Sequence, residues 1–346
     1  MLYENRHKNN LNVITLMKNN LASPEHLKQY SGWGGLGNSL SNPELYHNLR
    51  RLLTVEEMTS LKQTLTNAYY TPAHIVHFIY EWLGIYGFKG GDILEPAVGQ
   101  GVFLEHMPQA IKDQSTITTV ELDCLTSQIV TTLYPYTTHH TMGFERYHPK
   151  QRFDLILGNP PYGKESVVDT RHPDLNPYKI HHYFVAKSMR LLKEGGILAM
   201  VLPCYFLDNV QEHVRTLIDQ EGGSLLAAYR LPDDLFQNAK VTVDIVFLTK
   251  GKTDKAWVSV EDMTVAGYKK PMNIYYHLHS QHILGNLEIV DIYDRKGLTC
   301  KRRGSLSYQL KNVLKGLQQD QIIHRLQPLQ SLLASIDLTS LDKDMG

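Results

Sequence analysis

The chain of 346 residues is 42% hydrophobic and 20% charged, which is ordinary for a globular protein. Its 35 basic and 35 acidic side chains cancel, so a nucleic-acid partner would have to bind a local basic face. No apolar run is long enough to cross a membrane, no signal peptide is recognisable, and Cys124, Cys204 and Cys300 are too widely spaced for a zinc site or a disulfide framework, so we expect a cytoplasmic protein without a metal.

Residues 1–66 are predicted to form a mainly helical extension. They contain the glycine-rich stretch 30–37, in which we expect Trp33 to be a buried aromatic plug. Thr54 and Glu57 have the spacing of a capping box, which predicts a helix that begins there.

From residue 67 to residue 250, strands alternate with helices. Thr71 and Pro72 predict the first helix, with Thr71 as N-cap and Pro72 in the first turn, and the pair Gly195-Gly196 predicts where a later helix stops. This alternation predicts an α/β fold with a doubly wound, mostly parallel sheet, whose ligands bind at the carboxyl ends of the strands. The expected helices cover 75–83, 102–107, 125–133, 182–192 and 210–218, and the expected strands cover 92–95, 118–121, 153–158, 197–202, 225–231 and 241–248.

Residues 251–346 differ in character and are predicted to be a C-terminal extension. A polar stretch continues to about residue 303, and residues 306–333 are expected to form one or two helices. The stretch contains the basic run 301–303, which makes this extension a candidate for DNA contact.

The most informative motif is Asn159-Pro160-Pro161-Tyr162, which follows the predicted strand 153–158. The Asn side-chain oxygen and a Pro carbonyl can each accept one N–H of a planar exocyclic amine, which frees the nitrogen lone pair for attack on a methyl group. Proline aims its carbonyl because its φ is fixed, and Tyr162 can stack on a flat base. The alternative is a Pro-Pro turn that only reverses the chain.

Two further features follow predicted strands and suit a nucleoside cofactor. Gly99 and Gly101 allow the chain to turn tightly after residue 95, although a lone GxG is weak evidence. Glu121 ends the next strand and can accept hydrogen bonds from both hydroxyls of a ribose. The loop after residue 95 supplies neither a GxGxxG nor a P-loop, which disfavours dinucleotides and nucleoside triphosphates as its ligands. These features together predict S-adenosyl-L-methionine (SAM) as the cofactor.

In the order of these motifs the chain resembles the γ-order, TaqI-type adenine-N6 DNA methyltransferases, over about residues 30–250. The resemblance implies a Rossmann-like, SAM-dependent enzyme that methylates adenine N6 in DNA after the base is flipped out. It also implies that Phe144 stacks on the SAM adenine. An Asp commonly precedes this Phe in the family, but this chain has Gly143 there, and Glu145 is a candidate substitute. The implied cofactor-binding residues are Tyr70, Thr71, Glu95, Pro96, Ala97, Gly99, Gly101, Glu121, Phe144 and Asn159.

A narrower resemblance rests on three stretches. Residues 30–37, 181–184 and 231–248 are similar to the methylase modules of large mobile-element proteins, which often include a helicase-like half. No Walker motif occurs here, so we expect the methylase alone. The expected partner is DNA, and a helicase-like or specificity protein is a further candidate.

A flipped adenine needs two flat walls. Tyr162 supplies one, and Phe236, which resembles the aromatic residue of the family's late motif, is the candidate for the other. Each such wall contributes about 1–3 kcal/mol of stacking. The alternative is that Phe236 packs under the edge of the sheet. No general base is required, and Asp154 is expected to face the sheet rather than the site.

The DNA-facing surface and the substrate leave alternatives open. Residues 163–180 are too polar for the core, so they are either a loop that orders on DNA or a solvated surface loop. Rival functions are methylation of a protein glutamine or an RNA base, and a non-catalytic binding module that kept the fold. The candidate phosphate contacts are Arg171, Lys179, Lys301, Arg302 and Arg303.

Overall fold

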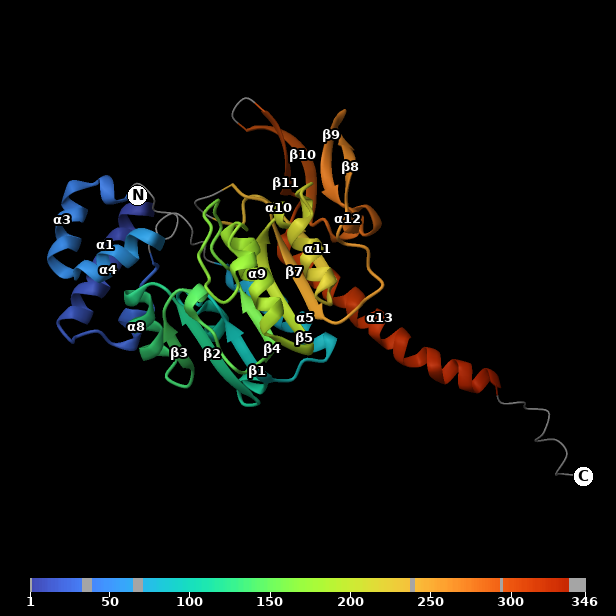
Figure 1. Ribbon diagram of the computed structural model, residues 1–346, viewed down its shortest axis with the longest axis horizontal. Helices are drawn as coiled ribbons and strands as arrows, with labels where there is room; N and C mark the ends of the chain where they lie inside the picture. The colour runs from blue at the N-terminus through green and yellow to red at the C-terminus, as the bar shows by residue number, and fades with distance from the viewer. Residues whose placement is uncertain (1, 33–38, 65–70, 237–239, 293–294, 336–346) are drawn as a thin grey trace, which may run out of the picture.

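The computed structural model describes residues 2–32, 39–64, 71–236, 240–292 and 295–335, and its centre is a seven-stranded sheet (Figure 1). The strand order is β3-β2-β1-β4-β5-β7-β6, in which β7 runs antiparallel to both of its neighbours while the first five strands pair in parallel. The expected doubly wound, mostly parallel sheet is therefore confirmed. The strands are β1 (Gly91–Glu95), β2 (Ser115–Glu121), β3 (Thr138–Thr141), β4 (Phe153–Gly158), β5 (Leu192–Pro203), β6 (Gly223–Leu231) and β7 (Val243–Lys250).

Helices cover both faces of this sheet (Figure 1). On β4 the side chains of Leu155 and Leu157 enter one hydrophobic cluster, and that of Ile156 enters the other, because successive side chains of a strand point to opposite faces. The first cluster includes α5 (Ala73–Tyr86), and the second includes α9 (Ile180–Leu191) and α11 (His213–Gln220). Further helices complete the alternation: α6 (Val102–Glu105), α7 (Gln109–Lys112), α8 (Cys124–Leu133) and α10 (Tyr205–Asp208).

The N-terminal helices pack on α8. Leu125 and Ile129 of α8 share a third hydrophobic cluster with them. The capping box is confirmed, because the Thr54 N–H donates to Glu57 Oε2 at 2.9 Å and the Glu57 N–H donates to Thr54 Oγ1 at 3.2 Å. Trp33, expected to be a buried plug, lies outside the described residues. The helices are α1 (Leu2–Lys18), α2 (Pro24–Leu27), α3 (Pro43–Leu52) and α4 (Val55–Thr64).

The polar stretch after residue 250 contains strands that the sequence pattern did not predict. They form two antiparallel hairpins, and side chains such as Trp257, Tyr275 and Cys300 pack against the second face of the sheet. A single helix follows, whose far end projects away from the body (Figure 1). The elements are β8 (Val260–Val265), β9 (Tyr268–Asn273), α12 (Ile274–Leu278), β10 (Gly285–Ile292), β11 (Arg295–Arg302) and α13 (Leu306–Ser335).

Two expected helix ends were wrong. The N-cap of α5 is Pro72, not Thr71, so the Thr71 hydroxyl is not used as a cap. Helix α9 ends at Leu191, and the chain is already extended at Leu192, where β5 begins, so the pair Gly195-Gly196 lies inside the strand and does not stop the helix. Within the described residues, no helix combines the length and the apolar character that crossing a membrane requires.

Candidate active site

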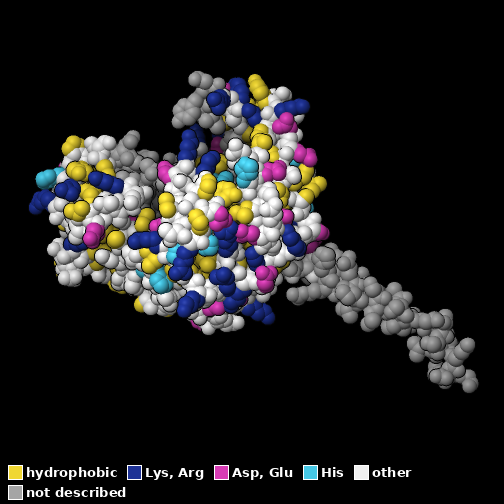
Figure 2. Space-filling model, viewed as in Figure 1, with side chains coloured by type: hydrophobic (Ala, Val, Ile, Leu, Met, Phe, Trp, Pro, Cys, Tyr) yellow, Lys and Arg dark blue, Asp and Glu magenta, His cyan; other side chains and the backbone are white. Residues whose placement is uncertain are grey.

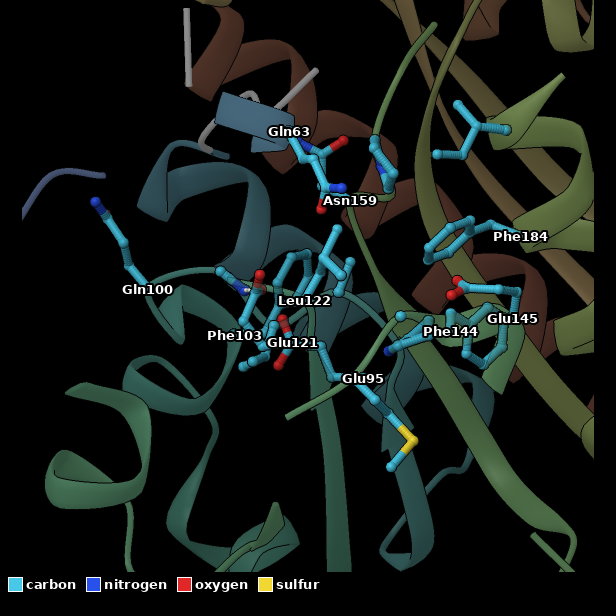
Figure 3. A pocket seen from close by; sticks show the side chains of 18 of the residues that line it. Gln63, Glu95, Gln100, Phe103, Glu121, Leu122, Phe144, Glu145, Asn159 and Phe184 are labelled. Atoms are coloured by element: carbon cyan, nitrogen blue, oxygen red, sulfur yellow. Dashed lines mark hydrogen bonds between the residues drawn. The ribbon is translucent and has the colours of Figure 1, made fainter. Parts of the chain in front are cut away.

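The carboxyl ends of three adjacent strands meet at one pocket (Figure 3). Glu95 ends β1, Glu121 ends β2, and Asn159 follows β4, and these strands are neighbours in the order β2-β1-β4. The pocket runs without interruption from the acidic pair to the Asn-Pro-Pro-Tyr turn. Its lining includes the predicted residues Thr71, Glu95, Pro96, Ala97, Gly99, Glu121, Phe144, Asn159 and Pro161.

The loop after β1 is held closely to the end of β2. The Gly99 N–H donates to Glu121 Oε2 at 2.8 Å, and the Val98 N–H donates to the Val120 carbonyl at 3.1 Å. Gly101 has a φ of 80°, and a Cβ there would lie 2.5 Å from the Tyr134 ring, so only glycine fits where the loop enters α6. Gly101 therefore shapes the loop but does not line the pocket.

The two carboxyl groups at the base of the pocket are buried. Burial raises the pKa of Glu121 to about 7, although its oxygens accept N–H groups from Gly99 and from Asp123. Burial, together with the neighbouring Glu121, raises the pKa of Glu95 well above its ordinary value. Both groups therefore favour a ligand that brings hydrogen-bond donors or positive charge.

Three buried polar atoms of residues that line the pocket have no hydrogen-bond partner among the described residues. They are Oγ1 of Thr71, Oε2 of Glu95 and Nε2 of Gln100. Buried polar groups are normally paired, so unpaired ones in a pocket mark where a ligand would bind. Hydrogen-bond acceptors that face the pocket suit the hydroxyl and ammonium groups of SAM, which donate. The side chains of the pocket therefore fit this cofactor.

Aromatic side chains form the opposite wall of the pocket (Figure 3). The rings of Phe144 and Phe184 lie with centroids 4.9 Å apart, and the ammonium of the wholly buried Lys187 donates to the Phe144 carbonyl at 2.7 Å. The sequence prediction included Phe144 but missed Phe184, although it singled out the stretch 181–184. It also missed other lining residues that no sequence motif singles out, among them Gln63, Phe103, Val167 and Ile180.

Gly143 and Glu145 share one space. A Cβ built on Gly143 would overlap both carboxylate oxygens of Glu145, which also lines the pocket. The carboxylate thus lies where a side chain from residue 143 would start (Figure 3).

The expectation that residues 163–180 are too polar for the core is wrong at two positions, while ordering of this segment on DNA stays a prediction. Asp169 and Leu175 are fully buried. The Asp169 carboxylate accepts from Lys187 Nζ at 2.8 Å, from the Tyr183 hydroxyl at 2.7 Å, and from two backbone N–H groups. The segment is therefore fixed to α9 by a buried ion pair, which a purely local view of its polarity could not predict.

One group of metal-ligand side chains occurs in the described part of the chain. It consists of His148, Asp169 and His172, whose ligand atoms lie within 4.8 Å of one another. Four donors already approach the Asp169 oxygens, and these occupy the four positions at which a carboxylate accepts. A cation there would have to displace one of these four donors, and the absence of a metal stays a prediction.

The predicted base walls, Tyr162 and Phe236, lie next to each other, and neither of them lines this pocket. Gly158 has a φ of 148°, a value that L side chains rarely adopt, at the step from β4 into the turn. Tyr162 is buried, and its hydroxyl donates to the Val201 carbonyl at 2.9 Å. The ring of Phe236 is also buried, with its centroid 6.4 Å from that of Tyr162 and the planes at 65°. The two rings are adjacent but edge to face, so Phe236 would have to turn to lie parallel to a base.

The predicted phosphate contacts divide into two groups. Lys301 pairs with Asp233 at 2.6 Å and Arg302 pairs with Asp234 at 2.7 Å, so both are engaged within the protein. Arg171, Lys179 and Arg303 are exposed and make no ion pair with another described residue. Lys and Arg side chains are interspersed with Asp and Glu over the face in Figure 2, without one dominant basic patch. Tyr70 lies outside the described residues.

The model of the N-6 DNA Methylase family matches residues 54–307, most of the chain. The chain belongs to this family. This confirms the resemblance to adenine-N6 DNA methyltransferases, the Rossmann-like class of the fold, and SAM as the cofactor. The narrower resemblance to mobile-element modules stays a prediction.

Individual relatives agree with this membership. The Type II methyltransferase M.TthHB8I of Thermus thermophilus is 31% identical over 181 residues, which cover 47% of this chain and 40% of that protein. The Defense against restriction protein B of Escherichia phage P1 is 26% identical over 236 residues, 66% of this chain but 9% of that protein. The chain thus spans well under two thirds of either relative. Among solved structures, the type I restriction-modification methyltransferase subunit of Streptococcus thermophilus has a TM-score of 0.47 at 15% identity, over 87% of this chain and 77% of that one.

Proposed function

We propose that this chain transfers a methyl group from SAM to the N6 amine of adenine in DNA. The observation that carries the proposal is the continuity of one pocket from the acidic pair Glu95 and Glu121 to Asn159 and Pro161. A cofactor and a target amine bound at its two ends would face each other directly.

The cofactor end is assigned residue by residue. Glu121 accepts hydrogen bonds from the ribose hydroxyls, since each of its oxygens still has an acceptor position beside its backbone N–H donor. Thr71 and Glu95 bind the methionine part, Phe144 packs on the adenine ring, and Glu145 accepts its amine. Bound SAM supplies a methyl carbon made electrophilic by the sulfonium.

The target end prepares the amine. Asn159 Oδ1 and the Pro160 carbonyl each accept one N–H, which concentrates the lone pair on the nitrogen and stabilises the positive charge that develops during attack. Tyr162 forms one wall for the base, and Phe236 turns from its edge-to-face position to form the other. Alignment in the pocket provides much of the acceleration, and no side chain is assigned as general base.

An adenine in a duplex cannot reach this pocket, so the base has to be flipped out. The exposed cations Arg171, Lys179 and Arg303 are the proposed phosphate contacts. The thiols of Cys124, Cys204 and Cys300 are all free, which fits our proposal that the protein acts in the reducing cytoplasm. A specificity or helicase-like partner is proposed to choose the DNA site.

The test is incubation of the purified chain with methyl-labelled SAM and plasmid DNA, bulk RNA, or a protein with an exposed glutamine. We expect label on DNA, at adenine N6 after nuclease digestion. Label on RNA alone or on protein alone would show that this molecule, and not DNA, is the substrate. SAM binding without transfer to any of the three would favour the non-catalytic module. Single-molecule sequencing of DNA from expressing cells would then give the sequence context of the modified adenines.

A further inference from the structure

The loop that carries Phe236 is fixed by a strand far away in the chain. Asp233 and Val241 close this loop, because the Asp233 carbonyl accepts the Val241 N–H at 3.2 Å, and we call this pair the neck of the loop. The Asp233 N–H also donates to the Cys300 carbonyl of β11 at 2.8 Å. Phe236 follows three residues later and meets Tyr162. The position of the second base wall therefore depends on how the neck is held.

Side chains of β11 bind the acidic residues at this neck. Oδ2 of the buried Asp233 accepts from Thr299 Oγ1 at 2.8 Å and from Lys301 Nζ at 2.6 Å. Arg302 binds Asp234 through two parallel hydrogen bonds of 2.7 Å, the arrangement that fixes both distance and orientation. Thr242, at the other end of the loop, also bonds to β11, because its Oγ1 accepts the Cys300 N–H at 3.1 Å.

Resting on the proposed function, we propose that Lys301 and Arg302 are positioning residues for the flipped base, and that they act through Asp233 and Asp234 rather than on DNA phosphates. Each basic side chain already has a carboxylate partner within the protein, at the neck of the loop that carries Phe236. A fixed neck holds Phe236 near the position from which it turns onto the base. Arg303, which has no such partner among the described residues, is the neighbour that remains for phosphate contact.

The two roles predict different responses to salt. A Lys or Arg that neutralises a phosphate changes the slope of log K against log salt by about 0.9 when it is removed. A positioning residue leaves that slope unchanged and lowers the rate of transfer, because a misplaced wall of about 1 Å can cost up to about 100-fold. Removing the acidic partner of a positioning residue should then have the same effect as removing the Lys or Arg side chain itself.

The experiment compares Asp233→Asn, Lys301→Gln and the variant that combines both changes. Asp234→Asn and Arg302→Gln test the exposed pair, and Lys296→Gln on the same strand is the matched control. We expect the Asp233 and Lys301 variants to lose about 10- to 100-fold in kcat/KM for plasmid DNA, with the double variant no worse than either single variant. The salt slope and the SAM affinity should remain those of the wild type. The Asp234 and Arg302 variants should lose less, because that pair is exposed, and their exposure ensures a folded test protein.

Hydrogen exchange at residues 230–236 without DNA supplies a readout that does not depend on activity. Faster exchange in Asp233→Asn and Lys301→Gln, with Lys296→Gln unchanged, would support the anchoring role. Unchanged exchange would overturn the inference, and so would a shallower salt slope in Lys301→Gln alongside full activity in Asp233→Asn. A wild-type chain that methylates no DNA would refute the proposed function, while the exchange data would still report whether β11 fixes the loop.

Discussion

The carboxylate of Glu145 fills the space that a side chain on Gly143 would need. Any Cβ at residue 143 would overlap both of its oxygens. A side chain at residue 143 would therefore have to displace the Glu145 carboxylate, which is the far end of a flexible side chain, and this chain presents its carboxylate to the pocket from Glu145.

Exchanging these two positions should exchange their roles. Gly143→Asp alone is expected to weaken SAM binding through the overlap, and Glu145→Ala alone should weaken it about 10- to 100-fold through the loss of one charged hydrogen bond. The double variant should recover affinity, because its new carboxylate has room. Calorimetric titration with SAM measures this, with the exposed Glu194→Ala as control. A double variant that binds no better than Gly143→Asp would show that the two carboxylates are not interchangeable.

Asn159→Ala should separate binding from chemistry. The variant removes one acceptor for the target amine, so the methyl-transfer rate in a single turnover should fall by about 100- to 1000-fold. The SAM dissociation constant should stay close to that of the wild type, because Glu121 and the loop after β1 are untouched. Asn209→Ala, at the end of α10 and outside the pocket, is the matched control. Full turnover in Asn159→Ala would contradict the role given to the amide oxygen.

SAM binding should release protons near neutral pH. Burial raises the pKa of Glu121 to about 7, and a ligand that donates hydrogen bonds to the carboxylate lowers it again. Affinity should therefore increase from pH 6 to pH 7, by at most about tenfold per unit, and level off above pH 7. Titrations in two buffers with different heats of ionisation count the protons directly. In Glu121→Gln the dependence should weaken, and a wild-type protein that releases no protons would rule out this linkage.

The same carboxyl group affects the free protein in the opposite direction. Because its pKa is higher in the folded state than in the unfolded chain, it stabilises the protein at low pH. That contribution should be lost as the pH rises from about 4.5 to about 7. Thermal unfolding of wild type and Glu121→Gln across this range, without SAM, measures the difference.

The buried pair of Asp169 and Lys187 should be important for stability. Lys187→Met leaves a buried carboxylate without its counter-charge and should lower the free energy of unfolding by about 3–5 kcal/mol. The double variant Asp169→Asn with Lys187→Met should be closer to the wild type, because no unpaired charge remains. Hydrogen bonds from Lys187 and Tyr183 outweigh burial and hold the pKa of Asp169 at about 2. The wild-type contribution should thus be present above pH 4 and lost as the pH falls toward 2, which urea unfolding at several pH values would check.

The elements that could be predicted are those whose signals are local. Glu95, Glu121 and Asn159 follow apolar runs, and a parallel sheet places the ends of such runs at one edge. The contacts that could not be predicted join residues far apart in sequence. Polarity alone suggested that residues 163–180 were solvated, but Asp169 is buried because Lys187 comes to meet it.

The basic run at 301–303 shows the same limit. Its charges favour phosphate, yet the structure pairs two of them with acids 68 residues earlier. The hairpins after residue 250 were missed for a related reason. On β8 every side chain is exposed or half-buried, so this strand lacks the apolar run of the central strands.

The anchoring of Asp233 by β11 also constrains how the protein can be assembled. During synthesis Asp233 leaves the ribosome 68 residues ahead of Lys301, which anchors it. The nascent chain can therefore form the cofactor pocket before β11 is available to support the loop that carries Phe236. On the proposed role of β11, a chain that ends before residue 299 keeps the cofactor pocket but loses the strand that supports Phe236.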